Sequence, residues 1–169
     1  MLTALEEIRM YKIRAILDTT EDVIRTLMVD EKMNLEELHK NIATSFGFHG
    51  NEMASFYFTD DEWNQGEEIP LFNMSEFGDT LSMNMCVLSN TLPKVNDKLI
   101  YVYDFFKLWS FYIEVIDISD DSVTDTKIIM SVGTVPEEAP KKEFIAENTE
   151  ENELDDEFDS YDDFDFNNF

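Results

Sequence analysis

The last 27 residues limit how much of this chain can pack into a domain. Residues 143–169 contain 12 acidic residues, no basic residue and no apolar periodicity. A segment of this composition cannot bury enough surface to offset the entropy lost on ordering. The other 26 acidic residues and all 12 basic residues lie in residues 1–142. We therefore predict one packed domain over residues 10–142, followed by a disordered acidic-aromatic tail over residues 143–169.

The net charge of −26 bears on which partners the chain can bind. Phosphate contacts require clustered lysine and arginine, and the basic residues here are scattered among a larger number of carboxylates. The charge therefore predicts no direct nucleic-acid binding and favours a basic or apolar-grooved protein as partner. No apolar run approaches 18 residues, and the first residues lack a basic segment before an apolar one, so we expect a cytoplasmic protein and no membrane contact. Both Met1 and Met10 remain open as the true start.

Several runs have the pattern of strands. Residues 10–17 alternate apolar and polar side chains, residues 23–29 are apolar and β-branched, and a short polar loop joins them as in a hairpin. Residues 99–105 and 109–118 form a second predicted hairpin, residues 54–59 a further strand and residues 127–132 an edge strand. Residues 60–80 are acidic and punctuated by Gly66, Pro70 and Gly78, which indicates a polar connection.

Residues 35–46 have the spacing of an amphipathic helix. Asn34 and Glu37 form the pattern of a capping box at its start, and Gly47 is suited to its end. A second short helix is expected within residues 81–92. The predicted fold class is thus α+β, with two β-hairpins forming a sheet, one main helix packed on it and a second short helix.

Two groups of residues carry a resemblance to a known family. The run "LEELHKNIATSFGF", followed by "MASFYF" and then "LIYVYDF", resembles the Ri-plasmid Orf-three-like family, some members of which bear the TnpR label of an insertion-element passenger protein. The residues that match the family pattern are Arg25, Leu35, Leu38, His39, Phe46, Gly47, Tyr103, Asp104, Phe105 and Trp109.

The resemblance covers roughly residues 10–140 and implies an α+β fold without an established activity. The chain departs from the family at two places. Phe106 and Lys107 replace a Gly-Asp pair in the hairpin, and Glu52, Met53 and Ala54 replace a His-Leu-His run. A resolvase, which the TnpR label would imply, cradles a phosphate with several arginines, whereas this chain has three in total.

Three polar residues are candidates for the lining of a cleft: Asp104, His39 and Arg25. Asp104 is unusual within a β-prone run, and it either serves as an acid at a cleft or caps the hairpin turn. His39 follows Leu38 on the helix, where it either takes part in chemistry or packs at the core edge and bonds a backbone carbonyl. The second reading is favoured for both residues, and no catalytic residue is assigned.

The metal-binding patterns are incomplete. Cys86 is the single cysteine, expected to be a small buried hydrophobe, and His39 and His49 lie on separate elements. Residues 60–68 begin like a calcium loop, but Gly66 comes one place late and Leu71 stands where the bidentate glutamate belongs. We therefore expect a solvated acidic loop, no metal and no cofactor.

The aromatic residues have two readings. Trp109 and Phe46 are predicted to lie in the core, although the aromatic strands could alternatively stack on single-stranded nucleic acid in a basic groove. In the tail, aromatic side chains recur among aspartates, which is typical of a docking segment or of a solubilising one. The candidate docking residues are Phe158, Tyr161, Phe164, Phe166 and Phe169.

The sequence as a whole favours an uncharacterised, non-enzymatic protein-interaction or adaptor protein, associated with a mobile element, whose tail docks on a partner. Two alternatives stay open. One is a small-molecule-binding or hydrolytic domain that uses Asp104 and His39, and the other is an acidic decoy that mimics DNA.

Overall fold

The computed structural model of this chain describes residues 9–73, 81–120 and 126–140. Contacts divide the chain into two units, Met1–Ala139 and Pro140–Phe169, and the fold described below is that of the first unit. The predicted tail, with its five candidate docking residues, lies outside the described residues, as do residues 1–8.

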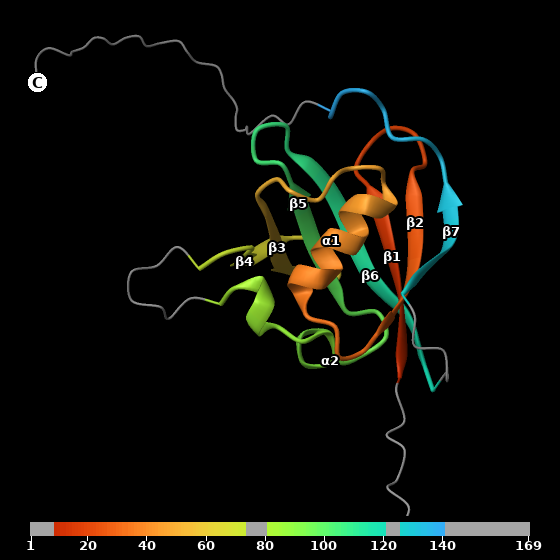
Figure 1. Cartoon of the computed structure of the whole chain (residues 1–169), viewed down its shortest axis with the longest axis vertical. Helices are drawn as coiled ribbons and strands as arrows, with labels where there is room; N and C mark the ends of the chain where they lie inside the picture. The colour runs from red at the N-terminus through yellow and green to blue at the C-terminus, as the bar shows by residue number, and fades with distance from the viewer. Residues whose placement is uncertain (1–8, 74–80, 121–125, 141–169) are drawn as a thin grey trace, which may run out of the picture. The chain divides into compact units, whose positions relative to one another are not determined.

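The main element of the fold is an antiparallel sheet with the strand order β4-β3-β5-β6-β1-β2-β7. Figure 1 shows β4 and β7 at its opposite edges. Its strands are β1 (Met10–Leu17), β2 (Ile24–Asp30), β3 (Ala54–Thr59), β4 (Gln65–Pro70), β5 (Lys98–Tyr103), β6 (Trp109–Ser119) and β7 (Lys127–Val132).

The alternation of side chains along the strands separates the two faces of the sheet. In β1, Tyr11, Ile13 and Ala15 are fully buried, whereas Lys12 and Arg14 are half-buried on the other face. Strands β5 and β6 repeat this period, so that Tyr101 and Tyr103 of β5 face the core with Phe111 of β6. A half-buried strand produces this pattern because successive side chains point to opposite faces.

Helix α1 (Leu35–Ser45) covers the buried face, and Figure 1 shows it lying across β5 and β6. The Asn34 side chain accepts the Glu37 amide at 2.9 Å, and the Glu37 carboxylate accepts the Asn34 amide at 3.3 Å, which completes the predicted capping box. At the other end the amide of Gly47, at φ +95°, donates to Thr44, and the amide of Phe48 donates to Ala43. These two bonds form a Schellman motif, which explains the glycine at this position.

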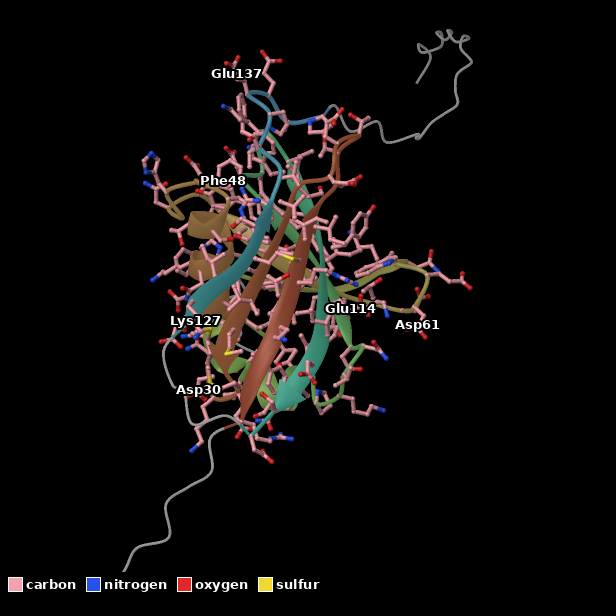
Figure 2. All side chains as sticks on the ribbon, turned by 90° about the vertical axis from the view of Figure 1, so that its right-hand side faces the viewer. Asp30, Phe48, Asp61, Glu114, Lys127 and Glu137 are labelled. Atoms are coloured by element: carbon pink, nitrogen blue, oxygen red, sulfur yellow. The ribbon has the colours of Figure 1, made fainter. Side chains whose placement is uncertain are left out.

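The opposite face carries charged residues between apolar ones. Arg14 pairs with Glu114 at 2.9 Å, and Lys98 lies 3.7 Å from Glu114 and 3.2 Å from Asp61. Figure 2 labels Glu114 and Asp61 on this side of the sheet. Helix α2 (Leu88–Thr91) and the 3₁₀ turn η1 (Met83–Met85) belong to the buried side, where Leu88 and Met83 are fully enclosed.

The predicted fold class holds at the level of α+β, but the expected sheet of two hairpins was too small. The described sheet has seven strands, and a third hairpin pairs β3 with β4. The prediction of a polar connection over residues 60–80 was wrong at Gln65–Pro70, because this strand lies at an edge and buries little besides Ile69. The expected short helix within residues 81–92 is divided into η1 and α2.

Candidate functional site

His39 is buried on the inner face of α1, next to Leu38, with 1% of its surface exposed. Its Nδ1 lies 2.6 Å from the hydroxyl of Tyr101, a fully buried residue of β5. The sequence predicted a backbone carbonyl as partner. The structure supplies a phenol instead, because β5 places Tyr101 beneath this turn of the helix.

Burial sets the protonation states of this pair. Desolvation, with a smaller contribution from the charge of Lys40, lowers the pKa of His39 from 6.5 to about 4. Desolvation also raises the pKa of Tyr101 well above 10. Both effects have one cause, since a poorly hydrated environment disfavours whichever form carries a charge. At neutral pH the two side chains therefore meet as a neutral imidazole and a neutral phenol.

A pocket of about 380 Å³ opens beside His39. One wall comes from α1, and the facing wall comes from the loop before β3 and the residues after β4. Its lining residues are Glu36, His39, Lys40, Gly50, Asn51, Glu52, Met53, Leu71 and Phe72. The loop is held in place by Tyr103, whose hydroxyl accepts the Gly50 amide at 3.0 Å.

The other two cleft candidates do not line this pocket. Asp104 begins the β5–β6 turn at φ +67°, and its carboxylate accepts the amides of Phe106 at 3.1 Å and Lys107 at 3.3 Å. The structure thus places Asp104 as the cap of the turn. This turn lies next to the pocket, because the Asp104 amide donates to the Met53 carbonyl at 2.8 Å.

Arg25 joins three elements. Its Nε donates to the Ser45 carbonyl at the end of α1 at 2.8 Å, and its Nη1 donates to the Val132 carbonyl of β7 at 2.9 Å. Its Nη2 donates to the Gly133 carbonyl at 3.2 Å, and the guanidinium lies 4.9 Å from the centre of the Phe46 ring. The structure therefore places Arg25 as a clamp between the helix and the last strand.

The acidic loop after β3 is organised by one carboxylate. Asp60 accepts the amide of Glu62 at 2.9 Å and both the backbone and side-chain nitrogens of Asn64, at 3.0 and 2.9 Å. These bonds, led by the one from the Asn64 side chain, lower the pKa of Asp60. Within the described residues, no group of three or more His, Cys, Asp or Glu side chains is arranged to hold a metal ion.

The aromatic residues of the strands mostly form the core. Trp109 and Phe46 are 4% and 5% exposed, which confirms their predicted place, and Cys86 is buried as expected. Phe48 packs between the rings of Tyr103 and Trp109 at centroid distances of 5.1 and 5.0 Å. Tyr103 and Trp109 are 2% and 4% exposed, so these rings belong to the core.

The sequence did not indicate an exposed apolar strand at one end of the sheet. All six residues of β7 are exposed, and its large apolar side chains are Ile128, Ile129, Met130 and Val132. Only the prediction of an edge strand over residues 127–132 pointed there. Figure 2 looks onto this side of the sheet, with Lys127 at the start of β7.

The sequence did not predict that Glu52 and Met53 line a pocket with His39. The available signal was the departure at Glu52 and Met53, where the family resemblance placed a His-Leu-His run. Those positions immediately precede β3 and line the pocket, so a difference from the family at this place changes its wall. The structure brings them to His39 through the pairing of β3 with β5.

The described residues contain no helix long and apolar enough to cross a membrane.

No curated protein sequence matches the chain. A crystal structure of a protein of unknown function, MM3350 from Methanosarcina mazei Go1, has a similar fold with a TM-score of 0.62. The two proteins are 19% identical, and the match covers 78% of this chain and 75% of the other.

The sequence pattern described as plasmid pRiA4b ORF-3-like protein matches residues 9–167. This match includes α1, the aromatic strands and the β5–β6 hairpin on which the resemblance was based, and it extends beyond residue 140. The chain therefore belongs to the plasmid pRiA4b ORF-3-like family.

Proposed function

We propose that this protein is a non-enzymatic protein-interaction module that binds an extended segment of a basic partner along β7. The observation that carries the proposal is the exposure of β7. It ends the described sheet, yet it presents four large apolar side chains to solvent. Unpaired strand edges are templates for another strand, and a partner segment adds main-chain hydrogen bonds together with side-chain contacts.

The hydrogen bonds of Arg25 hold β7 in place before any partner binds. Strand β7 pairs with β2 from Ile24↔Val132 to Met28↔Lys127, and the Arg25 guanidinium fixes its far end through the Val132 and Gly133 carbonyls. Gly133, at φ +79°, passes so close to Asp22 that an added Cβ would lie 2.0 Å from the Asp22 carbonyl oxygen. A strand held at this end loses less entropy when a partner binds it.

Charge indicates which partner suits this edge. Asp22 lies beside Gly133 at one end of β7, Asp30 follows the paired part of β2 at the other, and Glu137 and Glu138 come shortly after the strand. A segment in which apolar residues alternate with Lys or Arg would satisfy both the apolar strand and the acidic surroundings. A second copy would bring another −26 charges to the same place, which disfavours self-pairing.

The polar candidates fit a binding role better than a catalytic one. The carboxylate of Asp104 is engaged by two turn amides, and His39 is a neutral imidazole bonded to Tyr101. These contacts of Asp104 and of His39 Nδ1 need no reaction to explain them, whereas nothing among the described residues covers the apolar side chains of β7.

The test uses a labelled peptide of about ten residues in which Lys alternates with Val and Ile, matching one edge of the sheet. We expect saturable binding by fluorescence anisotropy, with amide chemical-shift changes concentrated in Lys127–Val132. Met130→Lys should weaken binding about tenfold or more, because it removes an apolar contact at the centre of the interface. Met85→Lys is the matched control, since Met85 is also exposed, makes the same charge change and lies in η1.

Three results would contradict the proposal. A peptide of the same composition with its lysines grouped together could bind equally well, which would mean recognition by charge alone, as in a DNA-mimicking decoy. The two methionine variants could lose affinity equally. Sedimentation could also show a dimer that only Met130→Lys dissociates, which would make a second copy the occupant of the edge.

The acidic-aromatic tail is proposed to add to the same interaction. Its carboxylates would attract a basic partner in a salt-dependent way, and its aromatic side chains would add contact area that salt does not screen. Changing Phe158, Tyr161, Phe164 and Phe166 to Ser keeps the charge constant. In the full chain this variant should weaken capture of the peptide, and unchanged affinity would limit the tail to a solubilising role.

A further inference from the structure

We propose that the pocket beside His39 is a binding site for a small neutral molecule that carries a carbonyl or amide oxygen on an apolar body. This inference is independent of the proposed function. The pocket is formed by α1, the loop before β3 and the residues after β4, whereas the proposed protein-binding strand is β7 at the other edge of the sheet.

The hydrogen bond between His39 and Tyr101 runs from the phenol to the imidazole. Tyr101 has one proton to donate, and two acceptors are near it: His39 Nδ1 at 2.6 Å and the His39 carbonyl at 3.3 Å. The carbonyl lies inside α1, where it already accepts an amide four residues on. The shorter distance is typical of a hydroxyl donor. The phenol therefore donates to Nδ1, and the neutral imidazole must carry its own proton on Nε2.

The other ring nitrogen of His39, Nε2, is accessible from the pocket. Among the described residues, no hydrogen-bond partner is present for this atom. It is nevertheless not one of the fully enclosed atoms that lack a partner, which are Arg14 Nε and Thr26 Oγ1. Nε2 thus retains access to open space, and the ring lines the pocket. His39 is only 1% exposed, so its Nε2–H group is a nearly buried donor without a protein partner at the pocket.

The walls of the pocket combine apolar surface with a few charged side chains. Met53, Leu71 and Phe72 provide apolar surface, and the pocket volume of about 380 Å³ lies within the usual range for small-molecule sites. Two carboxylates, Glu36 and Glu52, outnumber the single cation Lys40, which itself lies 3.7 Å from Glu36. This balance disfavours an anionic ligand. The Nε2 donor disfavours a cationic ammonium, because two donors would then face each other.

The test compares three probes that share a benzyl group: N-benzylacetamide, phenylacetate and benzylammonium. Titrations of the full-length protein are followed by amide shifts of Gly50, Asn51 and Met53. We expect saturable binding of N-benzylacetamide, at least about tenfold tighter than that of the two charged probes, as one unsatisfied buried donor can discriminate by this amount. The imidazole ¹⁵N shifts should show the proton of His39 on Nε2.

The variant His39→Phe keeps a ring but removes the donor, and it should weaken N-benzylacetamide about tenfold or more. Met53→Trp fills the pocket from its exposed side without altering His39, and it should abolish binding even if His39→Phe does not fold. Met85→Trp is the control for the added indole, because it lies on η1 outside the pocket lining. The proposal is overturned if no probe saturates, if a charged probe binds as tightly as the amide, or if the proton resides on Nδ1.

Discussion

The two edges of the sheet are built from very different sequences. Strand β4 exposes Gln65, Gly66, Glu67 and Glu68 and ends at Pro70, whereas β7 exposes three β-branched residues and a methionine with one charge, Lys127. Carboxylates and proline are standard protection against pairing with another chain. The composition of β4 therefore disfavours pairing with another chain, and β7 lacks this protection.

Exposure alone does not distinguish the two edges. Both strands are accessible, but only β7 would bury apolar surface on pairing, and only β7 is clamped by an arginine from the neighbouring strand. A protein with a net charge of −26 can keep such a strand in solution because copies of the chain repel each other. The basic partner proposed for β7 is complementary to this charge.

The largest expected effect tests whether both edges depend on one core. Trp109 is 4% exposed at the start of β6 and pairs with Tyr103, in the middle of the sheet. Trp109→Ala should lower the free energy of unfolding by about 3–5 kcal/mol, because it deletes a buried large aromatic side chain. Denaturant unfolding followed by far-UV circular dichroism measures the loss. A loss below about 1 kcal/mol would mean that the two halves of the sheet are supported separately.

A pH titration should act on the half of the sheet that contains β3 and β5. His39 has its pKa lowered to about 4 in the fold against 6.5 when unfolded, so between these values the unfolded chain binds the proton and the folded chain does not. The free energy of unfolding is therefore unaffected by His39 above pH 6.5. It decreases as the pH falls from 6.5 towards 4, and the decrease is complete at about pH 4.

The free energy of unfolding should decrease by about 3 kcal/mol over that window. Unfolding measured at several pH values should show this decrease in the unchanged protein and not in His39→Phe, which has no titratable group at this position. Amides of β3 and β5 should show the excess more clearly than those of β7, whose one ionisable side chain, Lys127, is exposed. Identical pH profiles for the two proteins would mean that His39 is not held neutral by burial.

Removing the clamp should separate the two edges. Arg25→Ala deletes four hydrogen bonds, to the carbonyls of Ile24, Ser45, Val132 and Gly133. It should cost about 1–2 kcal/mol, since a partly exposed arginine is only partly desolvated. Hydrogen exchange should accelerate in Lys127–Val132 and remain unchanged in Gln65–Pro70. Arg25→Lys, which keeps the charge without the fork, should behave like the alanine variant. Equal acceleration at both edges would contradict a local clamp.

The smallest effect on stability, and the sharpest test of the comparison, comes from exchanging the character of the edges. Ile128→Glu and Glu67→Ile each change an exposed side chain and should alter the free energy of unfolding by no more than about 0.5 kcal/mol. Ile128→Glu should nevertheless reduce binding of the alternating basic peptide at β7. Glu67→Ile should leave that binding unchanged and increase self-association in sedimentation, because it removes a protecting charge from β4. If Ile128→Glu leaves the peptide affinity intact, the two edges do not differ as proposed.

The elements that the sequence predicted well are those specified by their own residues. Strands β1, β3 and β7 have the predicted bounds, and α1 begins at the predicted cap and ends one residue before the predicted Phe46. The period of two in residues 10–17 and the capping box at Asn34 are local patterns, so they need no knowledge of the rest of the chain. The core positions of Trp109 and Phe46 followed from the same patterns, because large aromatic residues on such elements are usually buried.

The remaining features depend on which segments meet. The residues of β4 read as a loop because an edge strand needs only one buried side chain, Ile69, and gains its hydrogen bonds from β3. His39 and Tyr101 are 62 positions apart, and the pocket adds residues 50–53 and 71–72 to the helix. By itself the sequence determined the helix, most of the strands and the charge. The tertiary structure decided the strand order, the partner of His39 and the exposure of β7, because pairing between distant segments leaves no periodic trace in either one.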